Sequence, residues 1–170
     1  GTGIGGGIVV DGRVLRGANG FAGEFSFIRN DAQAPVSMGN IFGGTGSWRT
    51  LVALMLSEKG MEDDGAVDGR RAFEWVAEAA RRGLDRYALM FDNMLPNLQA
   101  VLDPDVFAIA GGISCHPELM EALERQMEVA LSGFAGPLAG FPRPNVVAAQ
   151  LGNDANLYGA VQGAMRLAQS

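Results

Sequence analysis

Glycine residues at the start of the chain are the first group that could do chemistry. Five of the first seven residues are glycine, and Thr2 adds a hydroxyl group among them. Glycine permits a positive φ and lets another group come close to the main chain. The N–H groups of such a turn can point into one concavity and hold an anion. The run indicates a phosphate site, but a glycine-rich turn with no ligand explains it equally well.

The residues after this glycine run separate three interpretations of it. Gly1, Gly3 and Gly6 have the spacing G-x-G-x-x-G, but the dinucleotide-binding form of that motif needs a strand before it and a helix after it. Residues 8–15 are instead apolar on both sides of an Asp-Gly pair, which predicts a β-hairpin. The chain has no Gly-Lys-Ser/Thr sequence for a Walker loop. A glycine turn beside a hairpin looks like the phosphate loops of actin-like ATPases; a turn without ligand stays open.

A second glycine-rich segment, residues 16–24, ends on the carboxylate of Glu24. Its glycines frame Phe21, which we expect to be buried. A carboxylate at the edge of a loop can accept hydrogen bonds from two neighbouring hydroxyl groups, which is the chemistry of sugar binding. A solvated loop glutamate is the equally good alternative at this point.

The other polar candidates have simpler explanations. Glu62, Asp63 and Asp64 form an acidic cluster in a polar linker, and we expect them to be solvated. Cys115 and His116 are neighbours, but the sequence has no second histidine to complete a zinc set. We expect structural roles for both.

The spacing of apolar residues predicts the elements that position these groups. The expected strands cover residues 25–28, 106–110 and 145–149. The expected helices cover residues 48–56, 70–82, 84–102 and 118–131, with a last helix ending near residue 168. Ser47 should cap the first helix, Gly83 should end the second and Pro96 should bend the third.

The strand at residues 106–110 is apolar throughout, which is typical of a buried parallel strand. It is followed by Gly111-Gly112 and then by a helix that begins near Pro117. Open α/β sheets bind their ligands at this carboxyl end of the strands. The Gly-Gly turn is therefore a second candidate binding region.

Composition limits the kinds of protein that this chain could be. It has 170 residues, a net charge of −6 and a pI near 4.7, so a basic nucleic-acid surface is not expected. The single Cys115 fits a reducing cytoplasm, because it cannot form an internal disulfide. No apolar run reaches the roughly 18 residues of a membrane span. The first residue is not methionine, and we expect one domain cut from a longer protein.

Taken together, four segments resemble the ROK family, which groups repressors, open reading frames and sugar kinases. These segments are the Gly1–Gly7 run with its hairpin, residues 16–24, residues 103–114 and residues 151–155. Their order and spacing extend the resemblance over essentially the whole chain.

The resemblance implies an α/β fold of the actin-like, ribonuclease H-like class, with a mixed sheet, an N-terminal hairpin and helices on both faces. It implies that residues 1–170 are the C-terminal domain of a two-domain protein that binds ATP, Mg²⁺ and a hexose in the cleft between the domains. The other domain would supply the catalytic aspartate, so no catalytic residue is expected in this chain. A homodimer is also implied.

The resemblance also assigns ligands to residues. ATP phosphates would meet the residues Gly1, Thr2 and Gly3. The adenosine would lie beside Gly111, Gly112 and Ser114, and Glu24 would bind sugar hydroxyl groups. We add Asn19, from the same segment as Glu24, as a second sugar-binding candidate.

One departure from the family pattern changes the expected metal content. In most members Gly-Glu is followed, after two residues, by a histidine and then by a cysteine-rich zinc loop with a second glutamate. Here Phe27 stands at the histidine position, and residues 29–46 contain no cysteine. We therefore expect no zinc. Some members that resemble β-glucoside kinases also lack this loop.

The resulting expectation is part of an ATP-dependent sugar kinase that phosphorylates a hexose or a hexoside, such as a glucokinase or a β-glucoside kinase. The domain alone should be inactive, because the base is missing. One alternative is the effector-binding domain of a sugar-responsive transcriptional regulator, with a DNA-binding part upstream. A sugar sensor without chemistry is a third possibility.

Overall fold

The computed structural model describes residues 3–63, 65, 67, 72–73, 78–134 and 139–168. Its strands are β1 (Val9–Val10), β2 (Arg13–Val14), β3 (Phe107–Ile109) and β4 (Val146–Ala148). Its α-helices are α1 (Phe42–Thr45), α2 (Trp48–Glu58), α4 (Glu78–Asp92), α5 (Leu95–Leu102), α6 (Pro117–Leu131) and α7 (Ala155–Ala168). Four short 3₁₀ turns join them: η1 (Phe25–Phe27), η2 (Gly112–Cys115), η3 (Ser132–Phe134) and η5 (Gly152–Asp154).

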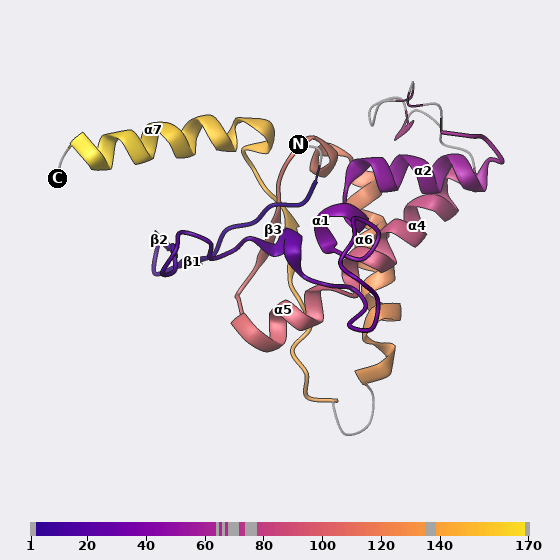
Figure 1. Cartoon of the computed structure of the whole chain (residues 1–170), viewed down its shortest axis with the longest axis horizontal. Coiled ribbons are helices and arrows are strands. Elements are labelled where there is room, and N and C mark those ends of the chain that lie inside the picture. The colour runs from indigo at the N-terminus through magenta and orange to yellow at the C-terminus, as the bar shows by residue number, and fades with distance from the viewer. Residues whose placement is uncertain are drawn as a thin grey trace.

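The core lies between α2, α4 and α6, with α4 in the middle (Figure 1). Each of the three helices buries one apolar stripe at helical spacing. The stripes are Leu51, Val52, Met55 and Leu56 on α2; Leu84, Tyr87, Ala88 and Phe91 on α4; and Leu119, Ala122, Leu123 and Met127 on α6. The buried Tyr87 hydroxyl donates a hydrogen bond of 2.6 Å to the Gly46 carbonyl, which ties α4 to the start of α2.

The hairpin prediction is confirmed. β1 and β2 pair antiparallel, with Val9 opposite Val14 and Val10 opposite Arg13. Asp11 and Gly12 form the two-residue turn with φ of 50° and 70°, the conformation that an Asp-Gly pair favours. The side chains of the hairpin are exposed.

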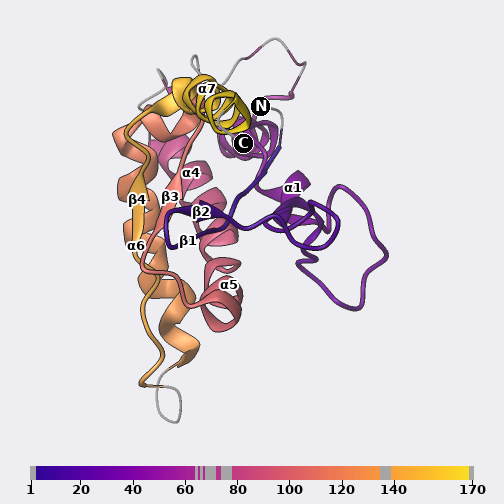
Figure 2. The same cartoon turned by 90° about the vertical axis from the view of Figure 1, so that its left-hand side faces the viewer.

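β3 and β4 form a parallel pair in which Phe107 is opposite Val146 and Ile109 is opposite Ala148. Helix α6 connects the two strands and packs against β4 (Figure 2). The α/β class is confirmed. Among the described residues, the antiparallel pair β1–β2 and the parallel pair β3–β4 form two separate sheets and not one mixed sheet.

Gly83 lies inside α4, so the prediction that it ends a helix is wrong. A Cβ atom there would lie 2.6 Å from Cα of Met55 on α2. The absent side chain lets the two helices approach closely. The buried stripe of α4 continues past Gly83, because Ala80 before it and Leu84 after it are both buried in the core.

Residues 25–27 form the 3₁₀ turn η1 and not a strand, because the Glu24 side chain accepts a hydrogen bond from the Ser26 N–H and caps the turn. The bend at Pro96 is confirmed: α4 ends at Asp92, and Pro96 lies in the first turn of α5, where no N–H is needed. The helix expected at 70–82 falls partly outside the described residues.

Candidate functional site

The glycine segment 3–7 is packed on one side and open on the other. A Cβ on Gly3 would meet the Gly43 carbonyl oxygen at 3.0 Å, and one on Gly6 would collide with the Phe25 ring. Cβ atoms on Gly5 and Gly7 would meet nothing within 4 Å. None of the N–H groups of residues 3–7 donates to another backbone group in the part of the chain that is described. Within the described residues, these glycines therefore offer backbone N–H groups without a backbone acceptor, and Gly3, Gly5, Gly6 and Gly7 are exposed.

The two glycine-rich segments are in direct backbone contact. Gly23 is buried with φ of 88°, and a Cβ there would lie 2.8 Å from Cα of Gly7. Only glycine permits both this conformation and this approach. The contact places the turn that carries Glu24 directly beside the glycine segment.

Glu24 is exposed, and its carboxylate is held by its own turn. Ser26 donates twice to Glu24 Oε1, from its hydroxyl at 2.6 Å and from its backbone N–H at 3.3 Å. Among the described residues, Glu24 Oε2 receives no hydrogen bond. One carboxylate oxygen is thus fixed, while the other can accept hydrogen bonds from a ligand. Asn19 lies on an exposed turn of the same segment.

The sequence suggested that Phe21 is buried, and this expectation is wrong. Phe21 is 62% exposed, and Phe27 is also 62% exposed. The two rings contact each other with centroids 5.9 Å apart and planes inclined by 30°. The hydrophobic character of Phe21 predicted burial, but its ring lies outside the hydrophobic core and contacts the exposed ring of Phe27.

The second candidate region lies where β3 and β4 end. The turn at Gly111, with φ of 100°, is open where a Cβ would stand, and Gly112 is exposed. Ser114 is 4% exposed, and its hydroxyl donates to the Gly111 carbonyl at 2.8 Å, so it holds the turn from inside. The turns η2 and η5 are adjacent, because both follow parallel strands. Gly1 and Thr2 lie outside the described residues.

The loop that precedes α1 is organised by Asn40, which is 6% exposed. Its side-chain nitrogen donates to the carbonyls of Asp31, Ala34 and Pro35 at 3.0 to 3.1 Å, and its oxygen accepts from the Asp31 N–H at 2.8 Å. These bonds close the loop on itself. They were not recognised in the sequence, where one asparagine among many polar loop residues gives no signal.

No group of three or more histidine, cysteine or acidic residues that could hold a metal ion occurs within the described ranges. Cys115 is exposed, and the His116 ring stacks on Phe73 with centroids 3.9 Å apart. The stacking gives His116 a packing contact, whereas the exposure of Cys115 does not assign it a role. None of the helices described is long and apolar enough to cross a membrane.

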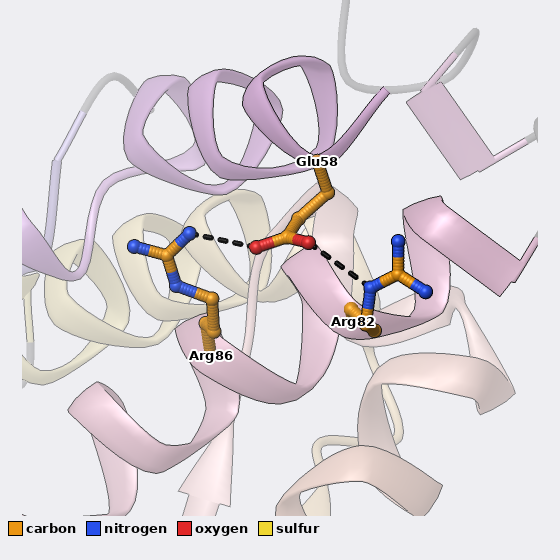
Figure 3. A network of polar contacts seen from close by, with 3 residues as sticks. All are labelled: Glu58, Arg82 and Arg86. Carbon is orange, nitrogen blue, oxygen red and sulfur yellow. Dashed lines mark hydrogen bonds and ion pairs between the residues drawn. The ribbon is translucent and has the colours of Figure 1, made fainter. Parts of the chain in front are cut away.

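A double ion pair joins α2 to α4 (Figure 3). Glu58 Oε1 accepts from Arg86 Nη1 at 2.8 Å, and Glu58 Oε2 accepts from Arg82 Nε at 3.0 Å. The hydrogen bond from Arg86 lowers the pKa of Glu58 most, and the hydrogen bond from Arg82 lowers it further. Burial raises this pKa but does not outweigh the two hydrogen bonds. This charge cluster positions the helices and has no connection to the glycine segments.

Asp92, at the end of α4, is fully buried, and neither carboxylate oxygen has a hydrogen-bond partner in the described part of the chain. Burial raises its pKa to about 8, while the charge of Arg143 lowers the pKa and that of Glu124 raises it. Arg143 is itself paired with Glu124 at 2.8 Å and with Glu128. Asp92 is therefore mostly protonated at neutral pH.

Comparison with known proteins gives one consistent result. A sequence profile of the ROK family matches residues 1–169. The chain is 31% identical over 186 aligned residues to a glucokinase of Streptomyces coelicolor, covering 94% of this chain and 56% of that protein. The chain spans between 28% and 56% of the length of the curated relatives.

Solved structures agree with these matches. A ROK family protein of Streptococcus pneumoniae in complex with sucrose superposes with a TM-score of 0.82 at 27% identity, covering 99% of this chain and 57% of that one. A ROK family glucokinase of Streptomyces griseus, in complex with glucose and AMPPNP, gives 0.78 at 26% identity, covering 95% and 57%. The actin-like fold expected from the resemblance is thereby confirmed.

Proposed function

Since this chain belongs to the ROK family, we propose that it is the C-terminal domain, residues 1–170, of a two-domain kinase that transfers the γ-phosphoryl group of ATP to a hexose or hexoside. The observation that carries this proposal is the backbone contact between Gly7 and Gly23. It joins a segment with free N–H donors to a turn with a free carboxylate oxygen. A phosphate group and a sugar hydroxyl could therefore be held on one surface.

The glycine segment fits a triphosphate. Its backbone N–H groups are the donors that an anion requires, and the open sides of Gly5 and Gly7 leave room for it. Gly1, Thr2 and Gly3 would bind the phosphates of ATP. Bound ATP–Mg²⁺ would supply the group that is transferred, and the role of this chain would be to position it.

The turns at the ends of β3 and β4 fit the adenosine half of the nucleotide. Gly111 and Gly112 would let a flat ring approach the backbone, because a Cβ at Gly111 would meet nothing within 4 Å and Gly112 is exposed. Ser114 would act indirectly, by fixing the Gly111 turn through its hydroxyl.

Glu24 would orient the sugar. Ser26 fixes its Oε1, so a sugar hydroxyl that donates to Oε2 meets an acceptor whose position is already set. Asn19, in the neighbouring exposed turn, would add a second polar contact. The base that removes the proton from the reacting hydroxyl would come from the other domain.

Sugar-dependent ADP release by the full-length natural protein, measured across a panel of hexoses and hexosides, tests this function. Glu24→Gln should raise KM for the preferred sugar at least tenfold, because a charged acceptor is replaced by a neutral amide. Glu62→Gln, at an exposed position outside both glycine segments, is the matched control and should leave the kinetics unchanged.

The alternative function, an effector-binding domain of a sugar-responsive regulator, would use the same sugar site. The same assay separates the two, because a regulator would bind the sugar without consuming ATP.

We further propose that the protein is a cytoplasmic homodimer that uses no zinc. Light scattering and metal analysis of the purified full-length protein test the assembly and the metal content.

A further inference from the structure

Phe21 and Phe27 form an exposed aromatic pair immediately beside Glu24. Each is 62% exposed, and their ring centroids are 5.9 Å apart. Exposed single hydrophobic residues are common, but two large rings in contact at the surface form an apolar patch with a defined shape. The pair makes no contribution to the core, which lies around α2, α4 and α6.

The turn that holds Glu24 also fixes both rings. The Glu24 N–H donates to the Phe21 carbonyl at 3.2 Å, and Phe27 is the last residue of η1, which the Glu24 side chain caps. Ser26 packs against Gly43 of α1, where a Cβ would lie 2.7 Å from the Ser26 Cβ. The carboxylate and the aromatic pair are therefore parts of one hydrogen-bonded turn that packs against α1.

Such a turn can recognise two parts of one ligand. The free oxygen of Glu24 accepts hydrogen bonds from hydroxyl groups, whereas the phenyl rings offer flat apolar surface without any donor or acceptor. A free hexose can use the first feature. Only a ligand that carries a second ring next to the hydroxyl-bearing one can use both.

We propose that Phe21 and Phe27 bind the substituent of a hexoside, so that the preferred acceptor is a hexose joined to a second ring. This inference rests on the proposed sugar-kinase function. Two kinds of second ring have the flat apolar face that the phenyl rings would contact. An aromatic substituent has such a face on both sides, and a second pyranose ring has one formed by its C–H groups.

The loop closed by Asn40 approaches α1 at a position next to the one that Ser26 contacts. Met38 and Ser26 contact neighbouring positions of α1, Gly44 and Gly43, through the Met38 carbonyl and the Ser26 Cβ. The Met38 side chain is 67% exposed. The loop is therefore held next to the turn that carries the aromatic pair.

Calorimetric titration of the full-length natural protein tests the proposal. Glucose, phenyl β-glucoside and cellobiose serve as probes, in the presence of a non-hydrolysable ATP analogue. The measured quantity is the ratio of glucoside affinity to glucose affinity. Phe27→Ala and Phe21→Ala should each lower this ratio for phenyl β-glucoside by on the order of tenfold, because a stacked ring is lost.

Two further variants keep the test free of folding effects. Phe27→Tyr retains the flat ring and should retain the ratio. Phe141→Ala removes one ring of a different aromatic pair, Phe134–Phe141 with centroids 4.6 Å apart, and should change neither affinity. A smaller effect of Phe27→Ala on cellobiose than on phenyl β-glucoside would assign the aromatic substituent as the preferred second ring, and the reverse would assign a sugar.

A wild-type protein that binds glucose and glucosides, with ratios unchanged in Phe21→Ala and Phe27→Ala, would overturn the aromatic site and leave the kinase proposal standing. A wild-type protein that binds no sugar at all would overturn both. A wild-type protein that prefers glucose over every glucoside would also contradict the inference.

Discussion

Glu24 illustrates how a single residue acquires a binding role through its immediate neighbours. Its carboxylate would be an ordinary exposed group without Ser26, whose two donors occupy Oε1. The same local bonds form η1 and so place Phe27 at the surface. Charge, orientation and the aromatic neighbour thus arise from a few consecutive residues and do not depend on the distant core.

Asp92 presents the opposite case, a carboxyl group that the fold buries without a partner in the described residues. Moving a charged carboxylate out of water is costly, so the group keeps its proton instead. Its pKa therefore rises from an ordinary value of 3.8 to about 8. The native state then holds a proton that the unfolded chain releases above about pH 4.

The stability of the fold should consequently fall as pH rises from about 4 to about 8, through the pKa of Asp92 in the native state. Asp92→Asn cannot ionise and should remove this dependence. The variant should gain stability relative to wild type by up to about 1.4 kcal/mol per pH unit within that interval. Chemical denaturation at a series of pH values measures the difference.

The exposed Asp105 supplies the control for this experiment. Asp105→Asn should leave the pH dependence of stability as it is in the wild type. Parallel curves for wild type and Asp92→Asn between pH 5 and pH 9 would show that the Asp92 carboxyl is solvated or paired, contrary to the structure.

At the scale of elements, local signals identified much of the fold from the sequence. The Asp-Gly turn predicted the hairpin, because its two residues adopt positive φ with little strain. Pro96 predicted a bend where α4 and α5 meet, and the apolar residues of 106–110 and 145–149 predicted β3 and β4, although β3 is half-buried to exposed and not buried as expected. These features depend on the residues of one segment alone.

The errors arose where a distant segment determines the outcome. Gly83 has the composition of a helix end, but its role is set by Met55, nearly thirty positions earlier in the chain. The Glu24 cap replaced the expected strand at 25–28. In the candidate site, Glu24 and the glycine segment could be named from the sequence, whereas the contact between Gly7 and Gly23 required the structure.

The close approach of α2 and α4 at Gly83 can be tested by a substitution. Gly83→Ala should lower the free energy of unfolding by about 1–3 kcal/mol, because the added methyl group meets the Met55 backbone. The loss should appear although alanine favours a helix over glycine by about 1 kcal/mol. Denaturant unfolding followed by circular dichroism provides the measurement.

Gly163 in α7 is the matched position, since a Cβ there would meet nothing within 4 Å. Gly163→Ala should leave stability unchanged or raise it by up to about 1 kcal/mol. If Gly83→Ala behaved like Gly163→Ala, the close approach of α2 and α4 would be refuted.

At the scale of the whole molecule, α7 and the β1–β2 hairpin extend away from the helical core (Figure 1). More than half of the surface of each large apolar side chain is exposed at Leu157, Tyr158, Val161 and Met165 of α7, and the same holds for Val9, Val10 and Val14 of the hairpin. Exposed apolar surface on this scale is typical of a protein interface. It agrees with the proposed two-domain organisation, in which another part of the protein covers it.

We propose that this chain holds one half of a sugar-kinase site, in which the glycine segment and the turn that carries Glu24 meet through the backbone contact of Gly7 and Gly23. Sugar-dependent ADP release, measured side by side for the full-length natural protein and for residues 1–170 alone, tests it most directly. We expect turnover by the full-length protein only when sugar is present, and no turnover by residues 1–170, because the base would lie in the other domain. Sustained sugar-dependent turnover by residues 1–170, or sugar binding without turnover by the full-length protein, would contradict it.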